Sequence, residues 1–336
     1  MKPTIRIVHT GGTLGMRPRE PDRALAPDEF GTTVLEHVPE LSRIAEIEAQ
    51  VVYNIDSCDL TPTHWMELAR TIHRCADRCR GVVITHGTDA MAYTAAALSF
   101  VLRGLPFPVV LTGSQRPLAD IKTDGRANLI GAVDLATRAI PEVGIYFGGL
   151  LLRGNRATKT SSFAFGAFSS PNALPLVEVG AEVRQIQPTW PVTGEFRVEG
   201  SFDPRVVVLR LVPGQSIKAA RSVIDAETRG VLLVGFGTGN IALAKSDLQD
   251  LIRELTSAGV VVAIGSQAAH GRVDLGRYSG GRAAAEAGAV GIADMTLDAA
   301  VVKLMYLLGT HQEPAAVRQW LDRPISGEVT PATEQT

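Results

Sequence analysis

Short apolar runs that alternate with longer helical patterns constrain the fold of this chain more than any other feature. In the first half, β-branched runs predict strands at 4–9, 49–53, 81–85, 108–112 and 143–147. Helical patterns lie between them, at 62–79, 88–103 and 123–139. Strands that are apolar throughout are buried on both faces, as in parallel sheets covered by helices. The first half therefore predicts an α/β domain with a mostly parallel sheet.

The alternation weakens near the middle of the chain and then resumes. Residues 185–204 are rich in Pro, Gly and charge, which is typical of a hairpin or linker. Further strands are predicted at 205–212, 230–237 and 259–265, and further helices at 244–256, 278–288 and 297–309. We expect an N-terminal α/β catalytic domain over 1–187, a linker over 188–204 and a smaller C-terminal α/β domain over 205–336.

Charge and composition argue against several classes of partner. The net charge is −2 without a basic stripe, so neither nucleic acid nor an anionic membrane is expected as a partner. The longest apolar run, 91–102, is too short to span a bilayer, and the N-terminus has no signal-peptide core. Cys58, Cys75 and Cys79 form a sparse, odd set that indicates reduced thiols and a cytoplasmic location. No metal site is predicted.

Polar residues follow the predicted strands one after another. They are HTGGT (9–13), NIDSCD (54–59), THGTD (85–89) and GSQRP (113–117), and a further cluster, RGNRATKT (153–160), comes near the end of the domain. Any one of these residues is most often a helix cap or a turn residue, and His86 could equally be a buried, hydrogen-bonded imidazole. Ligands of open parallel sheets bind beyond the carboxyl ends of the strands, so the recurrence favours a site at that edge.

The residue types in these clusters suggest acyl transfer. A threonine hydroxyl is a weak nucleophile and needs a base beside it, and a lysine can serve if part of it stays neutral. Thr88, Asp89 and Lys159 could form such a relay. The glycines before Thr13 allow a substrate to approach the backbone, whose N–H groups could stabilise an oxyanion. This predicts attack on an amide, release of ammonia and hydrolysis.

A nucleotide-binding turn is the competing interpretation of the first cluster. The order GGTLG (11–15) is not GxGxxG, and the pattern over 16–30 does not predict the helix that should follow directly. The GK[ST] of a P-loop is missing as well. No nucleotide cofactor is therefore expected.

Taken together, the motifs resemble bacterial L-asparaginases, most closely the cytoplasmic type I group. The resemblance is carried by TGGTLGM (10–16), DSCDLTP (56–62), THGTDAMAYTAAALSF (85–100), TGSQRPL (112–118), RGNRATKT (153–160), GFGTGN (235–240) and GSQAAHGRVDLGRY (265–278), so that it covers nearly the whole chain. It implies a two-domain fold and hydrolysis of L-asparagine to L-aspartate and ammonia through an acyl-threonine. It implies no metal or organic cofactor, and a homodimer or dimer of dimers with sites near the subunit interface.

The same resemblance implies roles for particular residues. Thr13 matches the first nucleophilic threonine of the family, and Thr88, Asp89 and Lys159 match its second threonine–aspartate–lysine set. Asp89 would also bind the α-ammonium of the substrate. The α-carboxylate would lie at Asp56, Ser57 and Cys58, and Asn240 would come from a neighbouring subunit.

One departure from the family keeps other functions open. The family has a tyrosine on a lid after TGGT, but residues 14–35 contain none, and RALAP (23–27) stands at its expected place. A second family hydroxyl is replaced by Ala90. The chain could thus be a slow asparaginase, or an amidase for glutamine, a D-amino acid amide or a larger amide. An asparagine-binding sensor using Thr158 is another alternative. A tRNA-dependent amidotransferase subunit is expected to carry an extra N-terminal domain.

Overall fold

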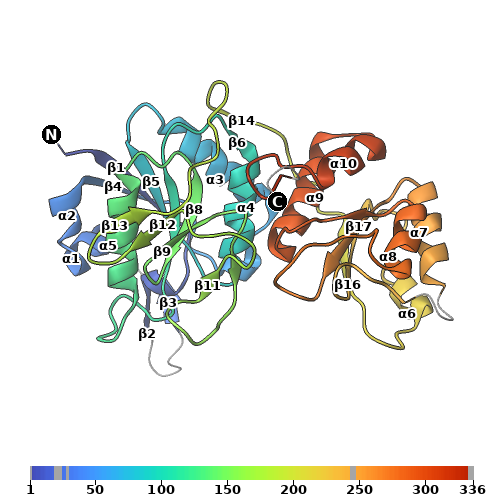
Figure 1. Cartoon of the computed structure of the whole chain (residues 1–336). Helices are drawn as coiled ribbons and strands as arrows, with labels where there is room; N and C mark the ends of the chain where they lie inside the picture. Colours follow the sequence, from blue (N-terminus) through green and yellow to red (C-terminus); the bar gives the residue numbers. More distant parts are fainter. Residues whose placement is uncertain (1, 19–24, 28–29, 243–246, 332–336) are drawn as a thin grey trace. The chain divides into compact units, whose positions relative to one another are not determined.

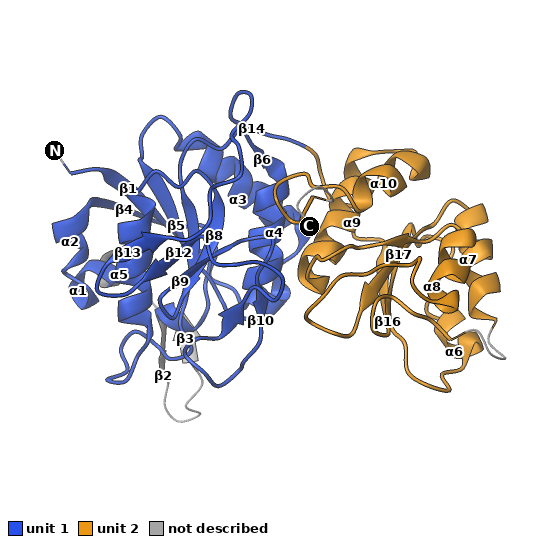
Figure 2. Ribbon diagram, in the orientation of Figure 1, with its two compact units in different colours: residues 1–199 blue, residues 200–336 orange. Residues whose placement is uncertain are grey.

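The chain forms two compact units, Met1–Glu199 and Gly200–Thr336 (Figure 2). A computed structural model describes residues 2–18, 25–27, 30–242 and 247–331. The division falls inside the segment that the sequence predicts as a linker. On its N-terminal side, β14 (Arg197–Val198) pairs antiparallel with β6 (Leu102–Arg103) of the first unit. On its C-terminal side, the Ser201 hydroxyl donates to the Gly309 carbonyl of the second unit.

The first unit is built on an eight-stranded sheet in the order β13-β12-β9-β8-β7-β5-β1-β4. Strands β4, β1, β5, β7 and β8 are parallel, whereas β9, β12 and β13 are antiparallel, which confirms the predicted mostly parallel sheet. In chain order the strands are β1 (Thr4–His9), β4 (Glu46–Val51), β5 (Gly81–Thr85), β7 (Val109–Thr112), β8 (Val143–Phe147), β9 (Leu150–Arg153), β12 (Val177–Val179) and β13 (Val183–Gln185).

The register of the parallel strands matters most for function. His9 at the end of β1 pairs with both Val51 and Thr85, and Thr85 pairs with Thr112. Four neighbouring strands therefore end at the same level, and the polar clusters that follow them leave the sheet at one edge. Strand β9, which the sequence did not predict, returns antiparallel to β8 through Gly148 and Gly149, whose φ angles of 57° and 88° are those a tight hairpin turn requires.

Helices cover both faces of this sheet (Figure 1). They are α1 (Phe30–His37), α2 (Leu41–Ile44), α3 (Pro62–Arg74), α4 (Met91–Val101) and α5 (Gly125–Ala136). Alternate residues of β1, Ile5 and Ile7, are fully buried in the core cluster that also contains Leu129 and Val133 of α5. Helix α4 begins at Met91 rather than at the predicted 88, because Thr88 and Asp89 belong to the turn that follows β5. Helices α1 and α2 were not predicted.

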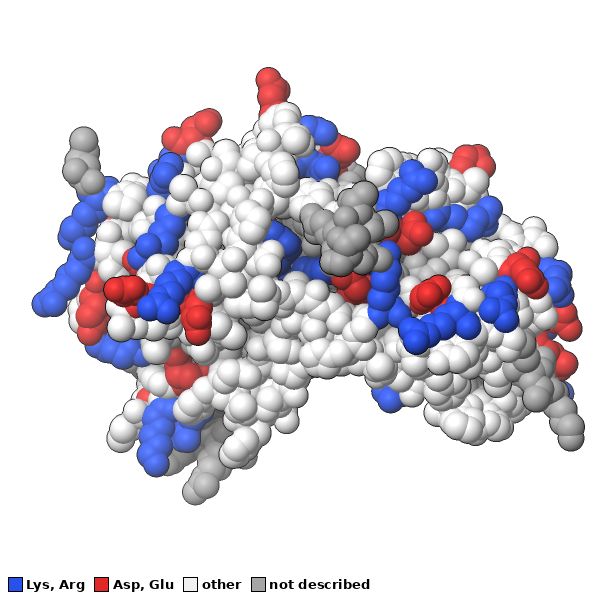
Figure 3. Space-filling view, in the orientation of Figure 1, with Lys and Arg blue, Asp and Glu red and all other residues white. Residues whose placement is uncertain are grey.

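The second unit is smaller and has its own parallel sheet, β15 (Val206–Arg210), β16 (Gly230–Gly235), β17 (Val261–Ser266) and β18 (Val290–Gly291). Its helices are α6 (Ile217–Arg221), α7 (Leu248–Ser257), α8 (Ser279–Glu286), α9 (Leu297–Thr310) and α10 (Pro314–Leu321). The predicted α/β class is thus confirmed for both units. Acidic and basic side chains are interspersed over the face in Figure 3. Among the described residues, the helices are too short or too polar to cross a membrane.

Candidate active site

The turn after β1 places Thr13 beside the turn after β5. Gly11 and Gly12 have φ angles of 111° and 89°, a conformation that favours glycine, and Thr13 opens the short 3-10 turn η1 (Thr13–Gly15). A Cβ atom on Gly12 would lie 2.4 Å from the backbone nitrogen of Gly87. The two turns therefore touch through their backbones. This contact brings Thr13 next to the segment that carries Thr88.

Lys159 joins the other members of the predicted catalytic set. Its Nζ donates to Thr88 Oγ1 at 2.8 Å and to Asp89 Oδ1 at 2.7 Å. Thr88 is buried, the Lys159 side chain is 19% exposed and the Asp89 side chain is 63% exposed. An ion pair as exposed as this one adds little to stability. The arrangement is therefore better explained by chemistry: an amine in contact with a hydroxyl can exchange a proton with it.

The turn after β4 adds a third group of polar residues. Ser57 Oγ accepts a hydrogen bond from the Ala90 backbone at 3.3 Å, and Ser57 also packs against Gly87. Carboxylate and thiol atoms of Asp56, Cys58 and Asp89 lie within 4.8 Å of one another. Partial desolvation raises the pKa of the Cys58 thiol above its ordinary value, and the hydrogen bond and negative charge of Asp56 raise this pKa further. These three exposed groups would suit a cation, either an ammonium group or a metal ion.

Two buried histidines, His9 and His86, lie where β1 and β5 end and their turns begin. His86 Nδ1 lies 2.6 Å from the Gly87 carbonyl, and because a carbonyl can only accept, Nδ1 carries the proton. His86 Nε2 then accepts from the Thr94 hydroxyl at 2.9 Å, and Thr94 accepts from Trp65 Nε1 at 3.1 Å. Burial lowers the pKa of His86 to about 4, so the imidazole is neutral at pH 7. His86 is thus the buried, hydrogen-bonded imidazole of the simpler interpretation.

The support from His9, Thr94 and Trp65 was not predicted. His9 Nδ1 lies 2.7 Å from Thr85 Oγ1, and burial lowers its pKa to about 4, with His86 adding to the shift. His9 ends a strand like any buried residue, and Thr94 and Trp65 lie inside ordinary amphipathic patterns. Only one feature of the sequence could have indicated these three residues: each has a polar atom at a position that the apolar pattern predicts to be buried.

Asn240 belongs to the second unit, whereas the other predicted site residues belong to the first. It closes the turn after β16, where its backbone N–H donates to the Phe236 carbonyl at 2.8 Å. Its contribution to a neighbouring subunit stays a prediction. Part of the segment without a tyrosine, 19–24 and 28–29, lies outside the described residues. After η1 the chain forms β2 (Met16–Pro18) and β3 (Leu25–Pro27), which pair antiparallel, instead of a helix.

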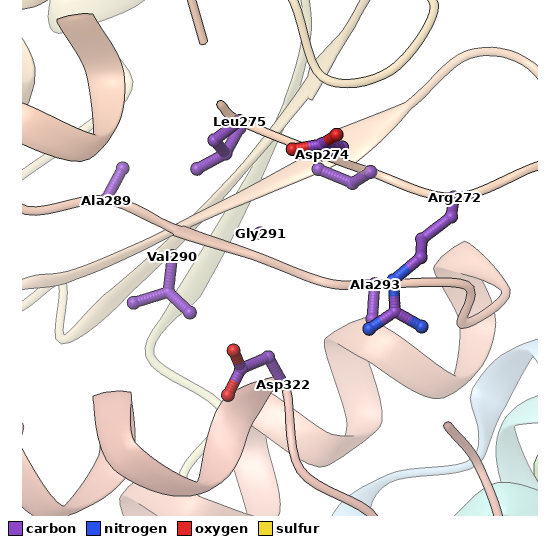
Figure 4. Close-up of a pocket in the computed structure, with 9 residues that line it drawn as sticks. Arg272, Asp274, Leu275, Ala289, Val290, Gly291, Ala293 and Asp322 are labelled. Atoms are coloured by element: carbon purple, nitrogen blue, oxygen red, sulfur yellow. The ribbon is translucent and has the colours of Figure 1, made fainter. Parts of the chain in front are cut away.

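A cavity of about 460 Å³ also lies in the second unit (Figure 4). The loop Arg272–Leu275, the edge strand β18 and Asp322 at the end of α10 line it. The predicted site residues contribute nothing to its lining. The polar cluster at the strand ends of the first unit therefore remains the candidate active site.

Comparison with known families defines an enzyme of the amidohydrolase class. The N-terminal asparaginase domain matches residues 4–191, and the glutaminase/asparaginase C-terminal domain matches residues 205–321. The chain is 37% identical to L-asparaginase 1 of Escherichia coli (strain K12) over 98% of this chain and 99% of that protein. It belongs to the asparaginase family.

Solved structures agree over nearly the full length. The thermostable L-asparaginase from Thermococcus kodakarensis superposes with a TM-score of 0.90 at 34% identity, covering 98% of this chain and 100% of that chain. L-asparaginase I from Vibrio cholerae superposes with a TM-score of 0.89 at 36% identity, with the same coverage. These similarities establish the family and the two-domain fold.

Proposed function

We propose that this protein hydrolyses L-asparagine to L-aspartate and ammonia through an acyl-threonine intermediate. The observation that carries the proposal is the contact of Lys159 with both Thr88 and Asp89, beside the glycine turn that presents Thr13. Membership of the asparaginase family supports the choice of substrate. Neither a metal nor an organic cofactor is needed for this chemistry.

The reaction divides into two acyl transfers. The Thr13 hydroxyl attacks the side-chain amide carbon and a C–O bond forms. The C–N bond breaks as the hydroxyl proton passes to the leaving nitrogen, which departs as ammonia. Water then attacks the ester carbon and the C–O bond to Thr13 breaks. The proton that the water gives up passes along the hydrogen-bonded Thr88 and Lys159 pair to the Thr13 oxygen, and L-aspartate is released. Backbone N–H groups of the glycine turn are our candidates for stabilising the oxyanion in both steps.

Substrate orientation is assigned to the turn after β4 and to Asp89. The Asp89 carboxylate would bind the α-ammonium. The turn of Asp56, Ser57 and Cys58, which lies beside Asp89, would hold the α-carboxylate through the Ser57 hydroxyl and backbone groups. Holding both charged ends fixes the amide against the nucleophile, which is the positioning this catalysis needs. We further propose that the protein is cytoplasmic and acts as a homodimer or dimer of dimers, with Asn240 reaching the neighbouring site.

The first prediction tests the two threonines. Thr13→Ala and Thr88→Ala should each remove nearly all ammonia release from L-asparagine, because one removes the nucleophile and the other breaks the proton path. Circular dichroism should show an intact fold in both variants. Undiminished ammonia release by Thr13→Ala would contradict the assignment.

A related amidase remains the second candidate, and the missing lid tyrosine is the observation that favours it. General base assistance is worth about 10²–10⁴ in rate, so its loss predicts a slow asparaginase or a preference for another amide. Ammonia release from L-asparagine, L-glutamine, D-asparagine and larger amides, each over a concentration series, separates these possibilities. Calorimetric binding of L-asparagine without turnover would instead indicate a sensor.

A further inference from the structure

The hairpin that carries Lys159 is too short to hold its own shape. Strands β10 (Thr158–Lys159) and β11 (Phe168–Ser169) pair over two residues each and form a separate two-stranded sheet. Isolated two-stranded hairpins are marginally stable even when they are longer. The position of the Lys159 amine must therefore depend on contacts from outside this hairpin.

One side of the hairpin is anchored by packing. The Phe168 ring lies 5.2 Å from the ring of Phe147, centroid to centroid, so that β11 rests on the end of β8. Gly166 also lies against Gly148, because a Cβ atom on Gly148 would be 3.0 Å from its Cα. These contacts fix β11. The loop after Lys159 is closed by its own bonds, from the Thr160 backbone N–H to the Ala167 carbonyl at 2.8 Å and from the Ala164 backbone N–H to Ser161 Oγ at 2.8 Å, but these bonds do not attach it to the rest of the unit.

Gln115 holds that loop. Its Nε2 donates to the Ser161 carbonyl at 3.3 Å and to the Ala164 carbonyl at 3.2 Å, which lie two and five residues beyond Lys159. Both groups are acceptors, so the amide must turn its nitrogen toward them, and both N–H bonds are used. Gln115 belongs to the GSQRP cluster after β7, which the proposed mechanism does not employ.

Gln115 is itself attached to a rigid element. Its backbone N–H donates to both carboxylate oxygens of Asp124, at 3.1 and 3.0 Å, at the N-terminus of α5. Asn128, one turn further along α5, donates from Nδ2 to Asp124 at 3.1 Å and to the Gly113 carbonyl at 3.0 Å. The buried pair on α5 thus fixes the loop from which the Gln115 side chain extends.

We propose that Gln115 is a positioning residue that acts through Lys159. It ties the β10–β11 loop to α5 and so keeps the amine within 2.8 Å of Thr88 and 2.7 Å of Asp89. Its side chain bonds to backbone carbonyls of the loop rather than to the groups assigned to substrate. The catalytic consequence rests on the proposed function, whereas the structural link to Lys159 does not.

A double-mutant cycle tests the catalytic consequence. Gln115→Met keeps the side-chain length but removes both donors, and we expect kcat for ammonia release to fall about 10- to 100-fold, the scale of a small misplacement of a catalytic group. KM should change little, because the groups assigned to substrate lie on other turns. When Lys159 is already replaced by Met, adding Gln115→Met should cause no further fall in kcat. Losses that multiply independently would overturn the proposal.

Chemical labelling of lysines tests the structural link without relying on turnover. Acetylation of the Lys159 amine, followed by mass spectrometry, should be severalfold faster in Gln115→Met than in the wild type. The matched control is Gln249→Met, which removes a hydrogen bond to the Ala283 carbonyl in the second unit and should leave Lys159 labelling unchanged. Equal labelling in wild type and Gln115→Met would overturn the proposal.

The two measurements separate the two proposals. If labelling changes but the wild type releases no ammonia, the proposed function fails and the positioning role stands. If the wild type is active but neither the cycle nor labelling responds, the positioning role fails alone. Should Gln115→Met not fold, Gln115→Asn keeps a polar amide one methylene shorter, which cannot reach both carbonyls, and the same results are expected.

Discussion

Thr10 and Thr13 show how position separates the roles of two identical side chains. The Thr10 hydroxyl and backbone N–H both donate to the Thr85 carbonyl at 3.0 Å, so this buried threonine joins β1 to β5. Thr13, three residues later, opens η1 beyond the glycine turn and is only half-buried. The sequence shows two hydroxyls around two glycines. Their neighbours make one a structural link and leave the other as the candidate nucleophile.

The two buried histidines, His9 and His86, predict how the free energy of unfolding depends on pH. In the folded protein His9 and His86 resist protonation down to about pH 4, whereas the unfolded chain takes up these protons below an ordinary histidine pKa of 6.5. Their stabilising contribution is therefore complete above pH 6.5 and is lost as pH falls toward 4. Each histidine adds a slope of up to about 1.4 kcal/mol per pH unit.

Urea unfolding at pH 7, 6 and 5 measures this slope above the range in which most carboxylates titrate. We expect the free energy of unfolding to fall between pH 6.5 and 5. His86→Gln keeps a polar side chain but cannot take up a proton, so it should show a shallower slope over the same range. A free energy of unfolding that stays constant from pH 7 to 5 would show that the two imidazoles are not held neutral by burial.

At the scale of elements, the site is made by turns that follow aligned strands. The turns after β1 and β5 are pressed together so closely that Gly12 has no room for a Cβ atom beside Gly87, and Gly87 has none beside Ser57 of the turn after β4. Glycine is required at residue 12 for two separate reasons, its φ of +89° and the 2.4 Å approach to the Gly87 nitrogen. A larger residue would push Thr13 away from Thr88.

Gly12→Ala tests this contact, and Gly214→Ala is its matched control. Gly214 has a similar φ of +76° but nothing within 4 Å of its Cβ position, so its substitution costs only the conformational strain of about 1–2 kcal/mol. Gly12→Ala carries the same strain and a backbone clash. We expect a larger loss of unfolding free energy by urea titration, and a loss of ammonia release of about 100-fold or more. Equal effects of the two substitutions would argue against the close packing of the turns.

On the scale of the whole molecule, a buried ion pair holds the segment that follows α10 against the rest of the second unit. Lys303 of α9 lies 2.6 Å from Glu328, and both side chains are 0% exposed. The Glu328 carboxylate also accepts from the Ile325 and Ser326 backbones, and Lys303 donates to the Arg323 carbonyl. The pair fastens the segment after α10 to the helix that packs on β15, β16 and β17.

Lys303→Met should destabilise the protein strongly, because it leaves the Glu328 charge buried without its partner. Removing one member of a buried pair costs about 3–5 kcal/mol. Calorimetry should show a lower melting temperature, whereas Lys218→Met on the exposed face of α6 should have little effect. Lys303→Met combined with Glu328→Gln removes the buried charge and should recover part of the loss. A mild effect of Lys303→Met alone would contradict this role.

The strands and the chemistry of the candidate site could be predicted from sequence because their signals are local. The predicted strands 4–9, 81–85 and 143–147 coincide with β1, β5 and β8. Each is a short, mainly apolar run bounded by polar or turn-forming residues, with Arg6 as the one charged interruption in β1, and such runs are typical of strands buried on both faces. The threonine, aspartate and lysine were selected by the same logic, from residue types that follow such runs.

Only the tertiary structure decided which of these residues meet. Lys159 contacts Thr88 from 71 positions away, through a two-residue strand that has no periodicity to recognise, and Gln115 holds it from a third loop. The start of α4, the antiparallel β9 and the pKa of His86 likewise depend on partners distant in the chain. Sequence patterns report which face of a segment is buried, whereas contacts, burial depth and pKa shifts are properties of the packed molecule.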